Sequence, residues 1–538
     1  MKPSLLVLKN FQSLRERTEI PIGPLTFLYG PNSAGKSCID DAFTLLGAVF
    51  QEGASKQSID SMVKRWRHFN FQSDEPQLGS DSNMLVELHF RTGNFRNAVY
   101  SGHAKLRWLI ESSDGLLDFF EREGNNFVLA IESDALGVSV LTFSTKNKSV
   151  FRIAFDNSDT EVEGELTIFL EPFGTDFRLI VEDEGRTIDR GVEAYTFDCI
   201  AEFRNRLHLT GLDDEAIDWE IAGVVNTLLL DLAELLTVPI NLGADRSTIP
   251  NSCLTTVCGL SHDYFKAPSF DLGLPADPKF GFMRQLAVSS FESAAAERAE
   301  ENNSAEAVEE NMRSVSNELL DPLHNSDYRQ SLPVPLRPTP QEPLHTFVNR
   351  CLGEHLFLDQ GYQLAFEALE ILPATGIQVK PLSAALMVGS LIDKEGRRMT
   401  FEDVGTGISC VIPVLVAVHS GFSFIQQPEL HLHPALQSAI GDIFVEATKL
   451  SHAHHFIETH SEYILLRCLR RVRETTKGIH PAGSPLALHP EDLKVVYFEP
   501  QPDGCTKVKN IRVSRQGDFI DRWPRGFFEE RSKDLFDE

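Results

Sequence analysis

Residues Gly30-Pro31-Asn32-Ser33-Ala34-Gly35-Lys36-Ser37 match the phosphate-loop pattern G-x-x-x-x-G-K-[ST] at every required position. In this pattern the glycines allow a tight turn whose backbone N–H groups face a phosphate, the lysine reaches the β- and γ-phosphates, and the last hydroxyl ligates Mg²⁺. The apolar run Leu25-Thr26-Phe27-Leu28-Tyr29 predicts a buried strand before the loop, and the spacing of Cys38 to Leu46 predicts a helix after it. An ordinary Gly-rich turn is the alternative, but this setting favours a site for ATP or GTP.

Length and composition indicate a globular protein of two to four domains or subdomains. The 538 residues are 42% hydrophobic and 24% charged, and the N-terminus does not resemble a signal peptide. The eight cysteines form no C-x-x-C pair, which favours a reduced, cytoplasmic protein. The longest apolar stretch, Ile408 to Ile425, is interrupted by Pro413 and His419 and predicts a buried helix and strand rather than a membrane span.

A formal net charge of −28 restricts the ways in which this chain could bind nucleic acid. Affinity for nucleic acid comes largely from Lys and Arg that neutralise phosphates, so a separate basic patch is required. Two stretches qualify, Lys64-Arg65-Trp66-Arg67-His68 and Arg467-Cys468-Leu469-Arg470-Arg471-Val472-Arg473. For each, a solvated helix face or a protein contact is the alternative to a nucleic-acid surface.

The region between the two ends of the chain is predicted from hydrophobic periodicity and turn residues. Six short runs of β-branched and aromatic residues predict an antiparallel meander: Met84 to Phe90, Phe127 to Ile131, Val138 to Phe143, Val150 to Phe155, Leu166 to Leu170 and Phe177 to Val181. Asp213 to Thr237 predicts an amphipathic helix, and residues 282–328 predict an acidic helical arm. Five prolines between Pro333 and Pro343 then indicate a linker or a rigid crossing segment.

A second group of motifs lies in the C-terminal part. The strand-like run Phe422-Ser423-Phe424-Ile425 ends in Gln426-Gln427-Pro428-Glu429-Leu430-His431-Leu432-His433-Pro434. This segment resembles the Walker B strand and D-loop of ABC-class ATPases. His455-Phe456-Ile457-Glu458-Thr459-His460-Ser461-Glu462 resembles their switch-histidine strand, and Glu402-Asp403-Val404-Gly405-Thr406-Gly407-Ile408-Ser409 stands at the place of their signature motif.

Lys36 and Gln426 lie at opposite ends of the chain, as in the split heads of the RecF, SMC and OLD branches. Together with the terminal Trp523-Pro524-Arg525-Gly526-Phe527-Phe528, the motifs resemble uncharacterised-domain AAA-type ATPases of bacterial phage-defence systems. The resemblance implies an α/β fold, an ABC-type P-loop ATPase head whose mixed sheet is flanked by helices, with an antiparallel β subdomain and a helical insertion. The expected segments are 1–245 and 371–538 for the two halves of the head, and 246–370 for the insertion.

The resemblance also implies the ligands and the partners. ATP and Mg²⁺ would be bound in an ATP-sandwiched homodimer, with Ser37 and position 426 at the metal. Gly405, Gly407 and Ser409 would face the nucleotide of the second subunit. The catalytic positions would be Gln426, Gln427, Glu429 and His460, with His460 as a γ-phosphate sensor or, alternatively, a core or capping histidine. Arg246 would lie near the nucleotide or in a structural ion pair.

Two positions depart from the family pattern. The family usually has Glu where this chain has Gln426, and Gln where it has Cys410. A carboxamide is neutral and cannot act as a carboxylate toward Mg²⁺, so we expect impaired hydrolysis with nucleotide binding retained. Natural loss of catalysis, an engineered substitution, and a carboxylate relocated to Glu429 or Glu458 all remain open. Glu429 could instead only cap the D-loop helix.

Three functions are compatible with these motifs. The first is a nucleotide-gated sensor or clamp in antiviral defence that controls a separate effector protein, possibly a nuclease. The second is a non-hydrolysing, ATP-bound scaffold, and the third is a RecF/SMC-like ATPase of DNA repair or maintenance. Nuclease activity of the chain itself is not expected, because the segment after His480 has no Asp-x-Asp pair.

Overall fold

The computed structural model describes residues 2–48, 56–67, 83–91, 126–133, 138–145, 149–154, 167–169, 240–244, 254–258, 286, 289, 342–369, 384–419, 422–451, 454–481 and 483–524. The chain forms two compact units. Unit 1 comprises Met1–Pro239, Pro490–Ser514 and Asp518–Glu538, and unit 2 comprises Ile240–His489 and Arg515–Gly517. Pro490–Ser514 and Asp518–Glu538 therefore belong to the same unit as the N-terminal part of the chain.

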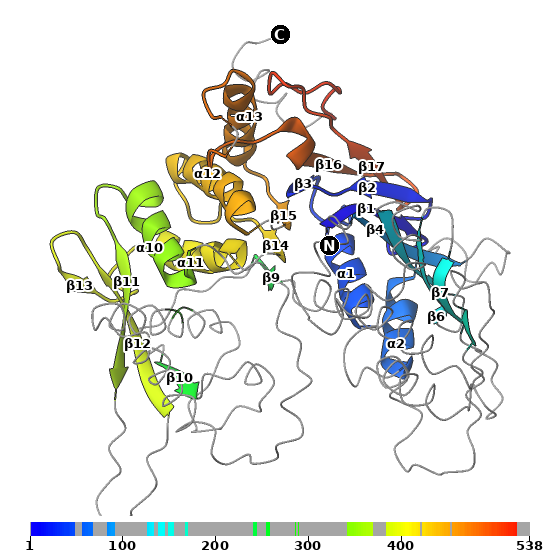
Figure 1. Ribbon diagram of the computed structural model, residues 1–538, viewed down its shortest axis with the longest axis horizontal. Helices are drawn as coiled ribbons and strands as arrows, with labels where there is room; N and C mark the ends of the chain where they lie inside the picture. Colours follow the sequence, from blue (N-terminus) through cyan, green and yellow to red (C-terminus); the bar gives the residue numbers. More distant parts are fainter. Residues whose placement is uncertain are drawn as a thin grey trace, which may run out of the picture. The chain divides into compact units, whose positions relative to one another are not determined.

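Unit 1 contains a seven-stranded antiparallel sheet in the order β2-β1-β4-β5-β6-β7-β8. Figure 1 labels β1, β2, β4, β6 and β7 of this sheet. Its strands are β1 Lys2–Lys9, β2 Thr18–Pro21, β4 Met84–Arg91, β5 Asn126–Ser133, β6 Val138–Thr145, β7 Ser149–Ala154 and β8 Thr167–Phe169. Buried and more exposed residues alternate along β4, as expected for a strand with one face in the core. The predicted meander is confirmed for five runs, while Phe177 to Val181 and the helix Asp213 to Thr237 lie outside the described residues.

A second group of strands in unit 1 carries the phosphate loop. In this group β3 (Leu25–Tyr29) runs parallel to β16 (Leu493–Pro500), and β17 (Thr506–Asn510) pairs with β16 in the antiparallel direction. All five residues of β3 are buried, and α1 (Cys38–Ala48) begins directly after the loop. The predicted strand–loop–helix order is therefore confirmed. Among the described residues of unit 1, the other helices are α2 (Lys56–Trp66) and the 3₁₀ turn Pro490–Asp492.

In unit 2, the parallel strands β9 (Ile240–Leu242), β14 (Phe422–Gln426) and β15 (His454–Glu458) lie side by side. Helix α11 (Thr406–His419) packs on β9 and β14, and α12 (Pro434–Ser451) connects β14 to β15 and packs on α13 (Glu462–Thr476) (Figure 1). Residues Ile408–Val418 of α11 are all buried, so the apolar run Ile408 to Ile425 forms a core helix and a strand as predicted.

The other described residues of unit 2 include a short helix and a smaller antiparallel sheet. Helix α10 (Leu344–Arg350) begins after Pro343 and continues into a π-helical turn, Cys351–Leu356. The sheet has the order β10-β12-β11, with β13 also paired to β12. Its strands are β10 Leu254–Cys258, β11 Gln363–Leu369, β12 Ala384–Ile392 and β13 Arg398–Met399. Apart from Leu286 and Ser289, the predicted acidic arm 282–328 lies outside the described residues.

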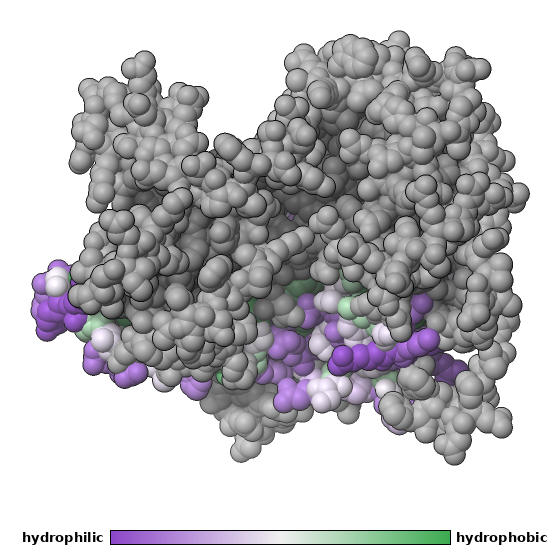
Figure 2. Space-filling view, turned by 90° about the horizontal axis from the view of Figure 1, so that it is seen from below, coloured by the Kyte–Doolittle hydropathy of each residue, from purple (hydrophilic) through white to green (hydrophobic). Residues whose placement is uncertain are grey.

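The described residues visible in one view of the surface are mainly polar. Figure 2 shows that the described residues on one face of the molecule are largely hydrophilic, with only scattered hydrophobic colour among them. Among the residues that the structure describes, no helix is both long enough and apolar enough to cross a membrane.

Candidate functional site

The phosphate loop has a backbone shape that two of its glycines make possible. Gly30 has φ +145° and Gly35 has φ +83°, both in a region that residues with a Cβ rarely adopt. A Cβ on Gly30 would lie 2.5 Å from the carbonyl oxygen of Phe498 on β16, and one on Gly35 would lie 2.3 Å from Ser13 Oγ. Ser33 also has a positive φ of 61°. The backbone angles of Gly30 and Gly35, together with the atoms close to each Cβ position, thus favour glycine at both positions.

Residues distant in the sequence hold the loop in place. The Thr506 hydroxyl, at the start of β17, donates a hydrogen bond of 3.0 Å to the carbonyl of Ala34. The Thr506 backbone N–H donates to the carbonyl of Ser13 at 2.8 Å. These contacts fasten the middle of the phosphate loop to β17 and to the loop after β1. Sequence reasoning missed Ser13 and Thr506, because neither belongs to a motif and only the tertiary structure brings them together.

Lys36 is buried and folded onto its own loop. Its Nζ donates to the carbonyl oxygens of Gly30 at 3.0 Å and Pro31 at 2.8 Å, and the residue is only 4% exposed. The ammonium group is therefore held beside the concave backbone of the loop rather than in solvent. Pro31, Asn32, Ser33 and Ser37 are exposed at the surface.

These features of the loop fit the binding of a nucleoside triphosphate. The positive φ angles of Gly30 and Gly35 give the loop the tight turn that, in phosphate loops, forms a cradle of N–H groups for phosphate oxygens. Lys36 lies at that cradle, and the Ser37 hydroxyl is available at the first turn before α1 for a Mg²⁺ ion carried by the nucleotide.

In unit 2, the predicted Walker B and switch-histidine strands are neighbours. Strands β14 and β15 pair in parallel with Gln426 opposite Glu458, and the Gln427 N–H donates to the carbonyl of Glu458 at 2.6 Å. Gln427 has a positive φ of 47°, so the chain turns sharply where β14 ends. The structure therefore places the predicted site residues Gln426 and Gln427 at one end of two adjacent strands.

Glu429 connects the loops that follow these strands. One carboxylate oxygen accepts from the Thr459 hydroxyl at 2.7 Å, and the other accepts from the His460 N–H at 2.8 Å. The Thr459 hydroxyl also accepts from the N–H of Ser461, whose own hydroxyl caps the N-terminus of α13. Glu429 thus fixes the backbone of His460, while the His460 side chain is exposed. Glu429 does not cap the D-loop helix α12.

The predicted signature region begins at the surface and ends in the core. Gly405 is exposed, and Gly407 lies close to the carbonyl oxygen of His431, 3.0 Å from where a Cβ would be. Ser409 is fully buried, and no described group hydrogen-bonds its hydroxyl. The sequence pattern places Ser409 among the nucleotide contacts. In this structure such a contact would require the first turn of α11 to move, because α11 is a core helix.

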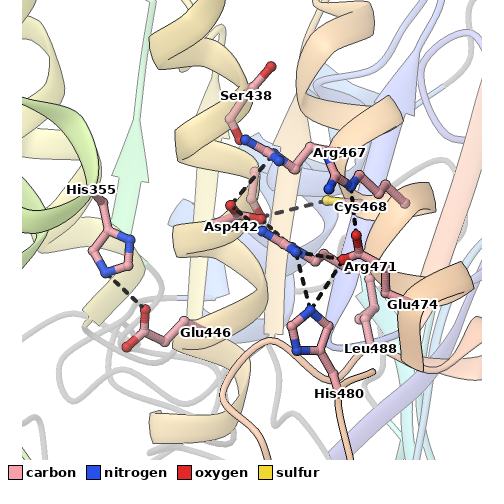
Figure 3. Close-up of polar contacts among 12 residues, drawn as sticks. His355, Ser438, Asp442, Glu446, Arg467, Cys468, Arg471, Glu474, His480 and Leu488 are labelled. Atoms are coloured by element: carbon pink, nitrogen blue, oxygen red, sulfur yellow. Dashed lines mark hydrogen bonds and ion pairs between the residues drawn. The ribbon is translucent and has the colours of Figure 1, made fainter. Parts of the chain in front are cut away.

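The arginine run on α13 is mostly occupied by ion pairs within unit 2. Arg471 makes a two-pronged ion pair with Asp442 on α12, with both distances 2.7 Å, and also contacts Glu474 and His480 (Figure 3). Arg467 approaches the same Asp442 at 3.5 Å. Burial raises the pKa of Glu474, but hydrogen bonds from Arg470 and Arg471 outweigh it and lower the pKa to about 2.

The outer arginines of the run are also engaged. Arg470 pairs with Glu474, and Arg473 donates to the carbonyl of Gln516. Of the four arginines in this run, predicted as one of two nucleic-acid surfaces, Arg467 and Arg471 contact α12, which is a protein contact of the kind that the sequence left open as the alternative. On α2, by contrast, Lys64 and Arg65 are exposed. His68 and Arg246 lie outside the described residues.

One further histidine is buried beneath the strand ends. His455 Nδ1 lies 2.8 Å from Ser423 Oγ on the adjacent strand, and the ring is completely buried. Burial and the neighbouring His454 lower the pKa of His455 to about 3, so the ring is neutral near pH 7. It is a core histidine rather than a ligand-facing one.

The strand–loop–helix geometry, with its glycine cradle and inward lysine, defines the fold as that of a P-loop ATPase, as predicted. A family described as "AAA domain, putative AbiEii toxin, Type IV TA system" matches residues 244–466, which include α11, β14 and β15. A second family, described as "Protein of unknown function (DUF3696)", matches residues 488–537, which include β16 and β17. No curated protein matches the chain.

The solved structures that match the chain include SMC heads. The SMC head bound to the C-terminal winged-helix domain of ScpA is 12% identical, with a TM-score of 0.41, 96% of this chain covered and 99% of that chain. The SMC head domain from Thermotoga maritima is 12% identical, with a TM-score of 0.35, 95% of this chain covered and 100% of that chain. Likenesses at this level do not determine a function.

Proposed function

We propose that this chain binds ATP with Mg²⁺ at Gly30–Ser37, hydrolyses it, and acts as a nucleotide-gated sensor or clamp in antiviral defence that controls a separate effector protein. The observation that carries the ATP site is the glycine cradle with Lys36 folded against it. The defence role is supported by the matching family model, whose description names a toxin of a TA system.

Each residue of the proposed ATP site would have a separate role. Lys36 would exchange its two carbonyl partners for phosphate oxygens, and the loop N–H groups would orient the phosphate chain. Mg²⁺ bound with ATP neutralises phosphate charge, and Ser37 would contribute a ligand. His460, whose backbone Glu429 holds, would be the sensor of the γ-phosphate. Gln427, in the turn after β14, and the residues next to it would position the attacking water.

A non-hydrolysing scaffold is the second candidate, and the specific observation in its favour is the neutral Gln426 at the end of β14. It predicts ATP binding without phosphate release. A role on DNA, as in the RecF/SMC-like alternative, finds no support on α13, where the inner arginines pair with Asp442 and Glu474.

The site assignment is tested by Lys36→Ala. Loss of this charge-assisted contact, worth about 1.5–3 kcal/mol, should weaken ATP binding by roughly tenfold to a hundredfold. The measurement is a titration of a fluorescent ATP analogue against the full chain. Lys64→Ala, which removes an exposed lysine on α2, is the matched control and should leave the affinity unchanged. Equal affinities for Lys36→Ala and the unaltered chain would overturn the phosphate-loop assignment.

A further inference from the structure

Thr506 is the residue with which the C-terminal part of unit 1 reaches the phosphate loop. It is only 7% exposed and begins β17, directly after the turn 501–505 that connects β16 to β17. In this turn the Gln501 N–H donates to the carbonyl of Cys505 at 2.7 Å, and the Cys505 N–H donates to the Asp503 carboxylate at 3.0 Å. A short, hydrogen-bonded hairpin therefore determines where Thr506 lies.

The strands that carry Thr506 and the loop belong to one sheet. Thr506 lies opposite Pro500 in the pairing of β17 with β16, and β16 runs parallel to β3, whose last residue, Tyr29, precedes the loop. The loop thus leaves one strand of the sheet and is contacted at its middle by a residue two strands away. The position of Thr506 is set by the sheet and does not depend on the conformation of the loop.

The Thr506 hydroxyl determines the orientation of the peptide between Ala34 and Gly35. It donates to the Ala34 carbonyl at 3.0 Å, and Ala34 is only 1% exposed. In a trans peptide the C=O and N–H groups point in opposite directions, so the Gly35 N–H is turned away from β17. Gly35 is partly exposed, and none of the hydrogen bonds between described residues uses its N–H as the donor.

Neighbouring donors of the loop are used within the loop itself. The Ala34 N–H donates to the carbonyl of Pro31 at 3.2 Å, and Lys36 Nζ donates to the same carbonyl at 2.8 Å. The Cys38 N–H donates to the carbonyl of Gly35 at 3.1 Å. The Gly35 N–H is thus a donor for which the described residues supply no acceptor, which suits a phosphate oxygen.

We propose that Thr506 is a positioning residue of the ATP site, which holds the peptide between Ala34 and Gly35 in the orientation that directs the Gly35 N–H at a phosphate oxygen. The inference rests on the proposed function and gives the C-terminal segment a role at its ATP site. Without the hydroxyl, the buried Ala34 carbonyl would lose this hydrogen bond and the peptide would be free to turn. ATP would then have to order the loop as it binds, which lowers the affinity.

The test compares the ATP affinity of the full chain with that of three variants at this position. Thr506→Val keeps the branched shape and removes the hydroxyl, Thr506→Ala removes the hydroxyl without adding volume, and Thr506→Ser retains it. Thr448→Val on α12 is the matched control, because the Thr448 hydroxyl is also buried and donates to a carbonyl, that of Val445, at 2.7 Å. Titration with a fluorescent ATP analogue measures the affinity, and a urea denaturation curve shows that each variant is folded.

Thr506→Val and Thr506→Ala should each weaken ATP binding by about threefold to tenfold, the loss of one hydrogen bond that orders the loop. Thr506→Ser should bind within about twofold of the unaltered chain, and Thr448→Val should bind ATP unchanged even where it is less stable. If Thr506→Val does not fold, the comparison of Thr506→Ala with Thr506→Ser decides.

Three results would overturn the inference. They are full ATP affinity in the variants without the hydroxyl, an equal loss in Thr506→Ser, and a loss of the same size in Thr448→Val, which would indicate general destabilisation. Lys36→Ala separates the inference from the proposed function. Weakened binding in Lys36→Ala with full affinity in Thr506→Val would overturn only the inference, whereas full affinity in Lys36→Ala would overturn the ATP site itself.

Discussion

Gly35 shows how a single missing Cβ determines the shape of the phosphate loop. Its φ is +83°, and a Cβ would lie 2.3 Å from Ser13 Oγ, nearer than real Cβ atoms approach other atoms. Gly396, in the turn between β12 and β13, has a similar φ of +79° but nothing within 4 Å of the Cβ position. Both glycines therefore have a positive φ that favours glycine, but only Gly35 also has another atom close to its Cβ position.

We expect Gly35→Ala to lower ATP affinity by at least about tenfold, because Ser13 and the loop must separate and the cradle opens. Gly396→Ala should cost only the left-handed backbone, about 1–2 kcal/mol of the free energy of unfolding, with ATP affinity unchanged. An ATP titration and a urea denaturation curve for each variant distinguish the effects. Unaltered ATP affinity in Gly35→Ala would mean that the loop relaxes without losing its phosphate contacts.

Between elements, the ion pair of Arg471 with Asp442 joins α13 to α12. Each side chain is only 12% exposed, whereas Arg470, one residue earlier, is 59% exposed and pairs with Glu474 on its own helix. Removing one partner of a largely buried pair leaves the other charge without compensation, but an exposed pair contributes little.

Arg471→Ala should therefore lower the free energy of unfolding by about 3–5 kcal/mol, and Arg470→Ala by less than about 1 kcal/mol. Urea denaturation at pH 7 measures both. Asp442→Asn provides a check from the other side of the contact and should destabilise the protein as well. Equal, small losses for Arg471→Ala and Arg470→Ala would contradict the structural role of this contact.

Local elements of this fold were predictable from the sequence, whereas contacts between distant segments were not. The order of β3, phosphate loop and α1 was predictable because it depends on neighbouring residues and a local hydrophobic period. The arginine run indicated cations on a helix but not which of them face inward, since Asp442 lies on a different helix. The pairing of β16 with β3, and the contacts of Thr506 with the loop, join opposite ends of the chain. No local pattern marks such contacts.

The candidate site in unit 2 was predicted to a similar extent. The strands β14 and β15 and their polar ends followed from short apolar runs and the resemblance to ATPase motifs. The register that places Gln426 opposite Glu458, and the two hydrogen bonds of Glu429, require tertiary structure. A motif lists carboxylates in chain order, and strand register decides which one stands beside Gln426.

At the scale of the whole molecule, the formal charge of −28 opposes any association of two copies. We nevertheless expect ATP with Mg²⁺ to convert a monomer into a dimer, because the exposed start of α11 at Gly405 and Thr406 offers backbone donors to the γ-phosphate bound by a second copy.

Repulsion between the copies is screened over about 10 Å at 0.1 M salt, so the dimer should strengthen as salt rises toward that concentration. Light scattering with and without ATP and Mg²⁺, at two salt concentrations, measures this. Lys36→Ala, whose ATP affinity should be roughly tenfold to a hundredfold weaker, should remain monomeric at an ATP concentration that just saturates the unaltered chain. A monomer under every condition would exclude the ATP-sandwiched dimer, whereas a dimer that is indifferent to ATP and to Lys36→Ala would show that other surfaces hold the subunits together.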